Sequence, residues 1–198
     1  MNMTLANKIT ISRFLLIPVM VVFMTLSTIF PDQNEILGMN IFHFIAAIIF
    51  VIAAATDFLD GYIARKRNEI TTFGKFLDPI ADKVLVISAM IYLVTIMPKR
   101  VMVWTVVVVI MREFLVTGIR LLAMERGKVI AASPYGKLKT IFTMIALIVL
   151  LFNDFGLTNV HQNFEWIGNI LWYVAIALTI ISGVDYFIKN KEIVFESV

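Results

Sequence analysis

Long apolar runs with few or no charges recur along this chain and limit what it can fold into. Six of them lie at roughly 14–30, 36–64, 75–97, 101–124, 134–153 and 164–188. A helix needs about 20 mostly apolar residues to cross a bilayer, so each run has a suitable length. Spanning strands would show segments of about ten residues with alternating polarity, which the run 84–98 does not. We therefore expect an all-α integral membrane protein with six transmembrane helices.

The composition agrees with this expectation and excludes several classes of protein. Of the 198 residues, 60% are apolar and 16% are charged, against about 45–50% and about 25% in ordinary soluble domains. Six spans leave only short connections, so residues 1–198 are expected to form a single membrane domain. No basic face of a soluble fold is present, so we expect no nucleic acid partner. The absence of cysteine excludes disulfides and thiolate metal sites, and two distant histidines disfavour a zinc site.

The basic residues predict how the helices are oriented. The connections expected on one side of the membrane contain only Lys99 and Arg100 as basic residues. The other side would carry Lys8, Arg13, Arg65, Lys66, Arg67, Arg126, Lys128, Lys137, Lys139, Lys189 and Lys191. By the positive-inside rule, a short N-terminal juxtamembrane segment and both termini should face the cytoplasm in a multi-pass protein of the cell membrane. The first run has no small-residue cleavage site before Pro31, so we expect it to be retained as an anchor.

Four aspartates interrupt the second and third runs near their expected cytoplasmic ends. Asp57 and Asp60 lie at the end of one run, and Asp78 and Asp82 lie at the start of the next. Residues three or four apart are neighbours on a helix, so each pair shares a face, and the connection between the runs brings the pairs to matching depths. Four close carboxylates repel one another, so a cation should join them. Oxygen ligands without His or Cys favour hard divalent ions such as Mg²⁺, which proteins usually hold together with substrate phosphates.

Small residues and one arginine accompany these acids. Gly61, Ala64 and Gly74 leave helix surface bare for the close approach of a ligand, and Arg65 offers a planar fork to phosphate oxygens. The glycines could equally serve as contacts between helices, with Arg65 as an anchor at the membrane interface.

The string Asp57-x2-Asp60-Gly61-x2-Ala64-Arg65-x8-Gly74-x3-Asp78-x3-Asp82 resembles the full signature of the CDP-alcohol phosphatidyltransferases. The signature covers residues 57–82 and fixes eight positions. Within the family, the chain most resembles the members that use glycerol 3-phosphate as the acceptor. The strings that carry this closer resemblance are Asn7-Lys-Ile-Thr-Ile-Ser-Arg13, Asp78-Pro-Ile-Ala-Asp-Lys83, Arg112-Glu-Phe114 and Gly136-Lys-Leu-Lys-Thr140. One departure is Ala6, where such members often have proline.

The resemblance implies transfer of the phosphatidyl group of CDP-diacylglycerol to glycerol 3-phosphate, with release of CMP. It implies two divalent ions, Mg²⁺ or Mn²⁺, held by Asp57, Asp60 and Asp78 with help from Asp82. Asp82 would also be the general base that deprotonates the acceptor hydroxyl. The residues implied at the CDP group are Thr10, Gly61, Ala64, Arg65 and Gly74. The family also suggests a homodimer embedded among membrane lipids.

Glycerol 3-phosphate is a dianion, so its site should be basic and open to the cytoplasm. Arg112 and Arg120 in the fourth run, with Lys137 and Lys139 at the start of the fifth, are the candidates for binding its phosphate. Arg112 and Glu113 are neighbours that point in different directions on a helix, so we expect Arg112 to be unpaired. Alternatively, Arg120 and the two lysines only anchor the inner face by snorkelling.

Other interpretations remain open at this stage. The acceptor could instead be inositol phosphate, serine or phosphatidylglycerol. Acids within spans also mark ion pathways, so an ion transporter is a further alternative. We expect His43 to be a core histidine bonded to a neighbouring helix and the connection 154–163 to be an outer polar linker without chemistry. Asp185 and Tyr186 could be interfacial or belong to the site.

Overall fold

The computed structural model describes residues 5–32, 35–67, 72–131, 133–159 and 165–195, without the side chains of 57–67 and of a few residues beside the gaps. Within these ranges the chain forms six α-helices, one 3-10 helix and one pair of short antiparallel strands. Their bounds are α1 Leu5–Ile29, β1 Glu35–Ile36, β2 Met39–Asn40, α2 Ile41–Arg67, α3 Thr72–Ile96, α4 Val103–Glu125, α5 Pro134–Leu151, η1 Asn153–Asn159 and α6 Glu165–Phe195. The predicted all-α class is confirmed, with the small hairpin as an addition.

Several of these helices are long and apolar enough to cross a membrane. In the described part of the chain they are Ile9–Ile29, Phe76–Ile96, Pro134–Leu151 and Glu165–Phe195, with a shorter apolar segment at Ile41–Thr56. The chain is therefore that of an integral membrane protein. The helix α4 is less apolar because Arg112, Glu113 and Arg120 interrupt its sequence.

The start of α2 differs from the prediction. We expected the second run to be helical from residue 36, but residues 35–40 form the hairpin and α2 begins at Ile41. Leu37 and Gly38 both have positive φ, at 54° and 72°, which is the backbone geometry of a tight hairpin turn. Asn40 then accepts a hydrogen bond from the Phe42 amide at 2.7 Å through its side chain, as residues before a helix commonly do.

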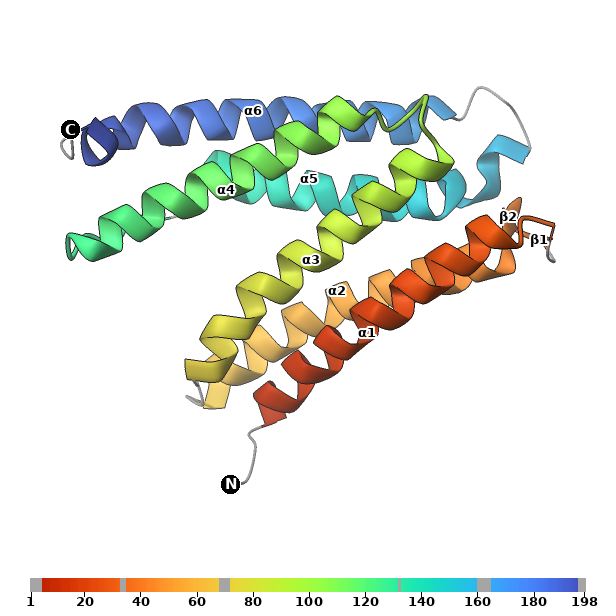
Figure 1. The fold of residues 1–198 in the computed structure, drawn as a ribbon, viewed down its shortest axis with the longest axis horizontal. Coiled ribbons are helices and arrows are strands. Elements are labelled where there is room, and N and C mark those ends of the chain that lie inside the picture. Colours follow the sequence, from red (N-terminus) through yellow and green to blue (C-terminus); the bar gives the residue numbers. More distant parts are fainter. Residues whose placement is uncertain (1–4, 33–34, 68–71, 132, 160–164, 196–198) are drawn as a thin grey trace.

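The helices form two groups that meet at one end and diverge at the other (Figure 1). The first group contains α1, α2 and α3, and the second contains α4, α5 and α6. Figure 1 shows that the start of α1, the end of α2, the start of α3 and the end of α6 all lie at the diverging end, as does the end of α4. The helix ends near which most basic residues of the sequence lie are therefore gathered at this open end, as the predicted orientation requires.

The end where the two groups of helices meet is called the closed end. A buried apolar core and a buried ion pair hold the helices together there. The core includes Met20, Phe50, Leu93, Leu147 and Trp172, which come from α1, α2, α3, α5 and α6. His43 is also buried, lies edge to face with Tyr92 at 5.2 Å and is hydrogen-bonded to the Leu151 backbone. The expectation that His43 is a core histidine bonded to another helix is confirmed.

The connection after α5 contains a buried acid that the sequence did not predict. Asp154 is 1% exposed, and its Oδ2 lies 2.7 Å from Nη1 of Arg100. Its Oδ1 accepts a hydrogen bond from the Gly168 amide at 2.9 Å, and Arg100 Nε donates to Asn169 Oδ1 at 2.8 Å. These contacts join the α3–α4 connection, η1 and the start of α6. The burial of Asp154 was not predicted, because hydrophilic residues in a connection can be buried against charges from a distant segment.

Candidate active site

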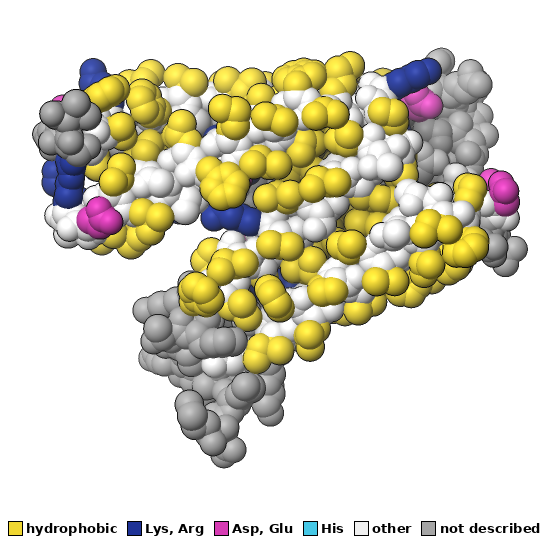
Figure 2. Space-filling model, in the orientation of Figure 1, with side chains coloured by type: hydrophobic (Ala, Val, Ile, Leu, Met, Phe, Trp, Pro, Cys, Tyr) yellow, Lys and Arg dark blue, Asp and Glu magenta, His cyan; other side chains and the backbone are white. Residues whose placement is uncertain are grey.

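Two adjoining cavities lie between the diverging groups of helices. The aspartate cavity, of about 340 Å³, is lined by Asp78, Pro79, Asp82, Lys83, Val86, Ile87, Met90, Val109, Glu113, Lys139 and Thr140. The basic cavity, of about 460 Å³, is lined by Lys83, Arg112, Glu113, Val116, Thr117, Arg120, Ser133, Gly136, Lys137, Thr140, Ile141 and Tyr186. Lys83, Glu113 and Thr140 line both. Figure 2 shows the hollow between the two groups, with basic side chains at its inner end.

The acids of α3 face the aspartate cavity. Asp78 and Asp82 are one helical turn apart and both line its wall. Asp78 Oδ1 is buried and has no hydrogen-bond partner within the part of the chain that the structure describes. The Asp82 side chain is 46% exposed. A buried carboxylate oxygen without a donor is costly unless a cation or another donor meets it, so this wall suits a positively charged ligand.

The sequence analysis missed the role of Arg13. Its guanidinium, contributed by α1, is fully buried, and Nη1 donates to Asp82 Oδ1 at 3.0 Å. We had taken Arg13 only as one of the basic residues of the inner side. Its place in the string 7–13, which carries part of the family resemblance, was the available signal. The pair links the first helix of the chain to the acid that the resemblance makes the general base.

Part of the predicted site lies outside the described side chains. These residues are Asp57, Asp60, Gly61, Ala64 and Arg65, which belong to the last turns of α2. Of the remaining nucleotide candidates, Thr10 is buried on α1, and Gly74 is buried on α3. Among the residues whose side chains are described, no three His, Asp or Glu residues are gathered. The meeting of the four aspartates stays a prediction.

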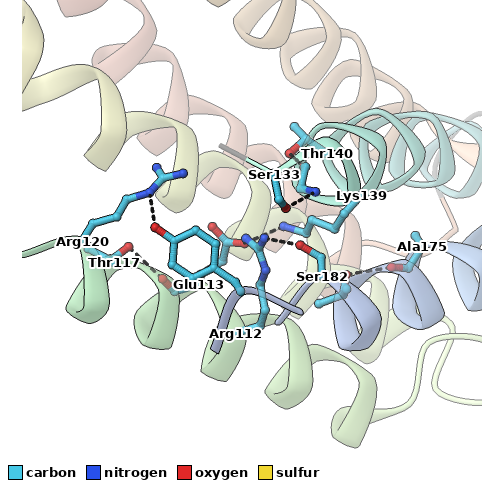
Figure 3. A network of polar contacts seen from close by, with 12 residues as sticks. Arg112, Glu113, Thr117, Arg120, Ser133, Lys139, Thr140, Ala175 and Ser182 are labelled. Atoms are coloured by element: carbon cyan, nitrogen blue, oxygen red, sulfur yellow. Dashed lines mark hydrogen bonds and ion pairs between the residues drawn. The ribbon is translucent and has the colours of Figure 1, made fainter. Parts of the chain in front are cut away.

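The predicted acceptor residues lie around one ion-pair network. Arg112, Arg120 and Lys137 line the basic cavity, whereas Lys139 lines the aspartate cavity. Glu113 Oε1 accepts from Lys139 Nζ at 2.6 Å and from Arg112 Nη1 at 3.0 Å (Figure 3). The structure thus brings all four basic residues to the open end of α4 and the first turns of α5.

The expectation that Arg112 is unpaired was wrong. Neighbouring residues leave a helix in directions about 100° apart, but the long stems of arginine and glutamate let their ends meet beside the helix. Arg112 and Glu113 are both partly buried, where an unpaired charge is costly. Lys139 joins the same carboxylate, so the network of these three residues has a net charge of +1, from two cations and one anion.

The helix α6 supports Arg112 from the other side. Ser182 Oγ lies 2.6 Å from Arg112 Nη2, and Figure 3 shows this serine reaching the arginine from α6. A Cβ added at Gly183 would lie 3.0 Å from Arg112 Cγ, and one added at Gly136 would lie 3.3 Å from Arg112 Nη2. These two glycines therefore leave the space that the arginine occupies. No periodic pattern in the sequence indicates the role of Ser182 or Gly183.

Tyr186 belongs to the wall of the basic cavity. Its side chain is 2% exposed, and its hydroxyl accepts a hydrogen bond from Arg120 Nε at 3.2 Å. The Arg120 guanidinium carbon also lies 5.7 Å from the centre of the tyrosine ring, within the range of a cation–π contact. Asp185 forms an ion pair with Lys189 at 2.7 Å and is not among the residues that line either cavity. Of the two residues that could be interfacial or belong to the site, Tyr186 therefore lines the basic cavity and Asp185 lines neither cavity.

The start of α5 places two lysines at the site. Ser133 precedes the helix in an extended conformation, and its Oγ accepts a hydrogen bond from the Gly136 amide at 3.1 Å. Pro134 occupies the first helical position, where its missing N–H costs nothing. Lys137 and Lys139 follow within the next turn and a half, so the capped helix start fixes where their stems begin.

Comparison with known proteins identifies relatives of this chain over most of its length. The family model of the CDP-alcohol phosphatidyltransferases matches residues 3–181. A protein of Bacillus subtilis strain 168 is 43% identical over 190 residues, covering 95% of each chain. One of Rickettsia typhi is 38% identical over 92% of this chain and 94% of its own, and one of Haemophilus influenzae Rd is 36% identical over 90% and 88%. All three bear the name CDP-diacylglycerol–glycerol-3-phosphate 3-phosphatidyltransferase.

The match of the family model extends over residues 3–181, and the relatives cover 90% or more of this chain. The resemblance drawn from residues 57–82 is therefore confirmed. The chain belongs to the CDP-alcohol phosphatidyltransferase family.

Proposed function

We propose that this protein transfers the phosphatidyl group of CDP-diacylglycerol to glycerol 3-phosphate, giving phosphatidylglycerophosphate and CMP. The observation that carries the proposal is the pairing of a basic cavity with an acid-lined cavity, which share the wall residues Lys83, Glu113 and Thr140. A water-soluble dianion suits the first cavity, and the diphosphate of the lipid suits the second. The relatives named for this same reaction support the assignment.

In this proposal Asp82 is the catalytic base. Its carboxylate takes the proton of the acceptor hydroxyl, the hydroxyl oxygen bonds to the lipid-linked phosphorus, and the bond from that phosphorus to the CMP oxygen breaks. The half-exposed position of Asp82 leaves it accessible to an acceptor. The hydrogen bond from Arg13 favours the ionised carboxylate and fixes its direction.

The four aspartates would hold two divalent ions, Mg²⁺ or Mn²⁺. The ligands we propose are Asp57, Asp60, Asp78 and Asp82, and the unpartnered buried oxygen of Asp78 fits a cation. Such ions neutralise the charge of a diphosphate and of the leaving phosphate. Thr10, Gly61, Ala64, Arg65 and Gly74 are proposed to surround the CDP group, with the small residues allowing close approach and Arg65 on the diphosphate.

The acceptor is the finer part of the proposal. Arg112, Arg120, Lys137 and Lys139 are proposed to bind its phosphate, and their charge exceeds that of the single anion Glu113. Serine and phosphatidylglycerol lack a phosphate dianion and match this surplus poorly. Inositol phosphate carries the same phosphomonoester group, so it is the second candidate that the basic cavity favours.

An acceptor screen tests the assignment. Purified protein with CDP-diacylglycerol and a divalent ion should release CMP rapidly with glycerol 3-phosphate and only at background rate with inositol phosphate, serine or phosphatidylglycerol. Arg112→Ala should raise the KM for glycerol 3-phosphate about 10-fold to 100-fold, because a charge-assisted hydrogen bond is lost. Faster turnover with another acceptor, or an unchanged KM in the variant, would refute the choice of acceptor.

The placement in the membrane follows from the same residues. We propose six membrane spans formed by α1 to α6, a multi-pass arrangement in the cell membrane, and both termini and the two cavities on the cytoplasmic side. The soluble acceptor then enters from the cytoplasm, and the lipid substrate enters sideways between the diverging groups of helices. A homodimer remains part of the proposal through the family resemblance.

A further inference from the structure

Lys83 is a basic residue of the site that belongs neither to the signature nor to the predicted acceptor residues. It follows Asp82 on α3, and of the lysines and arginines in the described part of the chain it alone lines both cavities. We propose that the Lys83 ammonium binds the phosphate of the acceptor at the junction of the cavities and so determines specificity for a phosphorylated acceptor. This inference rests on the proposed function, because it concerns the same acceptor.

The contacts of the neighbouring cations support this role. Arg112 is already bonded to Glu113 and Ser182, and Arg120 is bonded to Tyr186. Lys139 is bonded to Glu113. By contrast, no hydrogen bond or ion pair joins Lys83 or Lys137 to any other side chain that the structure describes. Two positive charges neutralise a phosphate dianion. Both of these lysines line the basic cavity, and neither has a side-chain partner in the described part of the chain.

The position of Lys83 also explains how an acceptor could be held beside the base. Asp82 is bonded to Arg13 of α1, whereas Lys83, the next residue, lies against the cavities that α4 and α5 complete. Lys83 and Lys139 both line the aspartate cavity, and like charges that share a cavity repel each other. An anion between α3 and α5 would relieve this repulsion. A phosphate bound there would leave the hydroxyl end of glycerol 3-phosphate within the aspartate cavity.

The alternative is that Lys83 only reaches toward the membrane surface along an apolar helix. Lys99 offers a matched control, because it is an exposed lysine in the connection between α3 and α4, at the closed end. Lys83→Gln and Lys83→Met remove the charge, whereas Lys83→Arg retains it. Lys99→Gln removes one charge far from both cavities.

Steady-state kinetics of the full-length protein in detergent micelles distinguishes acceptor binding by Lys83 from a role at the membrane surface. For Lys83→Gln and Lys83→Met we expect the KM for glycerol 3-phosphate to rise about 10-fold to 100-fold, as for loss of a charge-assisted hydrogen bond. The kcat and the KM for CDP-diacylglycerol should change less than threefold, by roughly the error of such comparisons. Lys83→Arg should recover most of the affinity, and Lys99→Gln should match the unmodified protein.

Other outcomes overturn the proposal. An unchanged KM for glycerol 3-phosphate means that Lys83 does not bind the acceptor, and a raised KM for CDP-diacylglycerol places it on the lipid diphosphate instead. A fall in kcat alone means that the variant disturbs Asp82. If the unmodified protein releases no CMP with glycerol 3-phosphate, the proposed function fails. Thermal stabilisation of the protein by inorganic phosphate then still tests the role of Lys83. The stabilisation should be smaller in Lys83→Gln than in the unmodified protein.

Discussion

At the scale of single residues, the charges of this protein act in groups whose members come from different helices. Arg13 and Asp82 join α1 to α3, and Arg112, Glu113 and Lys139 join α4 to α5. Each of these charges therefore has a neighbour that offsets its desolvation. Asp82 differs from the others in being 46% exposed and in lining the aspartate cavity, where an acceptor can reach its carboxylate.

Asp82→Asn tests this distinction. The amide has nearly the same shape but cannot take a proton from the acceptor, so turnover should fall to background while CDP-diacylglycerol still binds. Equilibrium binding of the lipid to the purified variant, measured beside CMP release, checks both parts. Loss of lipid binding would make Asp82 chiefly a metal ligand instead of the base.

The origin of these groups explains what could be predicted at this scale. Asp57, Asp60, Asp78 and Asp82 lie close together in the sequence, so the signature could be recognised without a structure. The partners of Arg13 and Arg112 lie 69 and 70 residues away in Asp82 and Ser182. Periodicity along a helix does not encode such pairings, so they could not be found from the sequence alone.

At the scale of elements, the contact between α4 and α6 decides where Arg112 lies. Gly183 brings the α6 backbone close to the arginine stem, and Ser182 meets its end. Tyr186, one turn further along α6, does the same for Arg120. The sixth helix is therefore a supporting wall of the acceptor site, although most of its sequence is that of an ordinary apolar span.

Gly183→Ala should displace Arg112, because the new methyl group would lie 3.0 Å from its Cγ. A shift of a few tenths of an ångström at a binding group should raise the KM for glycerol 3-phosphate by about several-fold. Gly118→Ala on α4 is the matched control, since nothing lies within 4 Å of its added Cβ. Equal kinetics for the two variants would contradict a positioning role for α6.

The number and order of the helices were predicted well, because hydropathy is an additive property of a continuous segment. The helix ends were predicted less well, since α1 begins at Leu5 and α6 ends at Phe195, beyond the apolar runs 14–30 and 164–188. The start of α2 was misplaced because Leu37, an apolar residue, adopts a positive φ in the hairpin. The burial of Asp154 was not foreseen because its partner Arg100 lies in another connection.

At the scale of the whole molecule, one end is closed and the other is open (Figure 1). The apolar core and the contacts of Arg100 with Asp154 and Asn169 hold the two groups of helices together at the closed end. At the open end the groups diverge and enclose the two cavities. Stability and ligand binding are thus assigned to opposite ends of the same helices.

Asp154→Ala should separate these two properties. Removing the acid leaves Arg100 partly buried without its ion-pair partner, which costs roughly 3–5 kcal/mol for a buried pair. The thermal unfolding midpoint should fall, while the KM values of the folded variant stay unchanged. Asp32→Ala, at an exposed position, should leave the midpoint unchanged. A normal midpoint for the first variant would contradict the assignment of stability to this end.

The measurement that tests the central claim most directly follows both products of one reaction. Purified protein, CDP-diacylglycerol and glycerol 3-phosphate should yield CMP and phosphatidylglycerophosphate in equal amounts, and chelation of divalent ions should stop both. The account is contradicted if CMP forms without that lipid, if the lipid product carries another headgroup, or if turnover continues at the same rate after the divalent ions are removed.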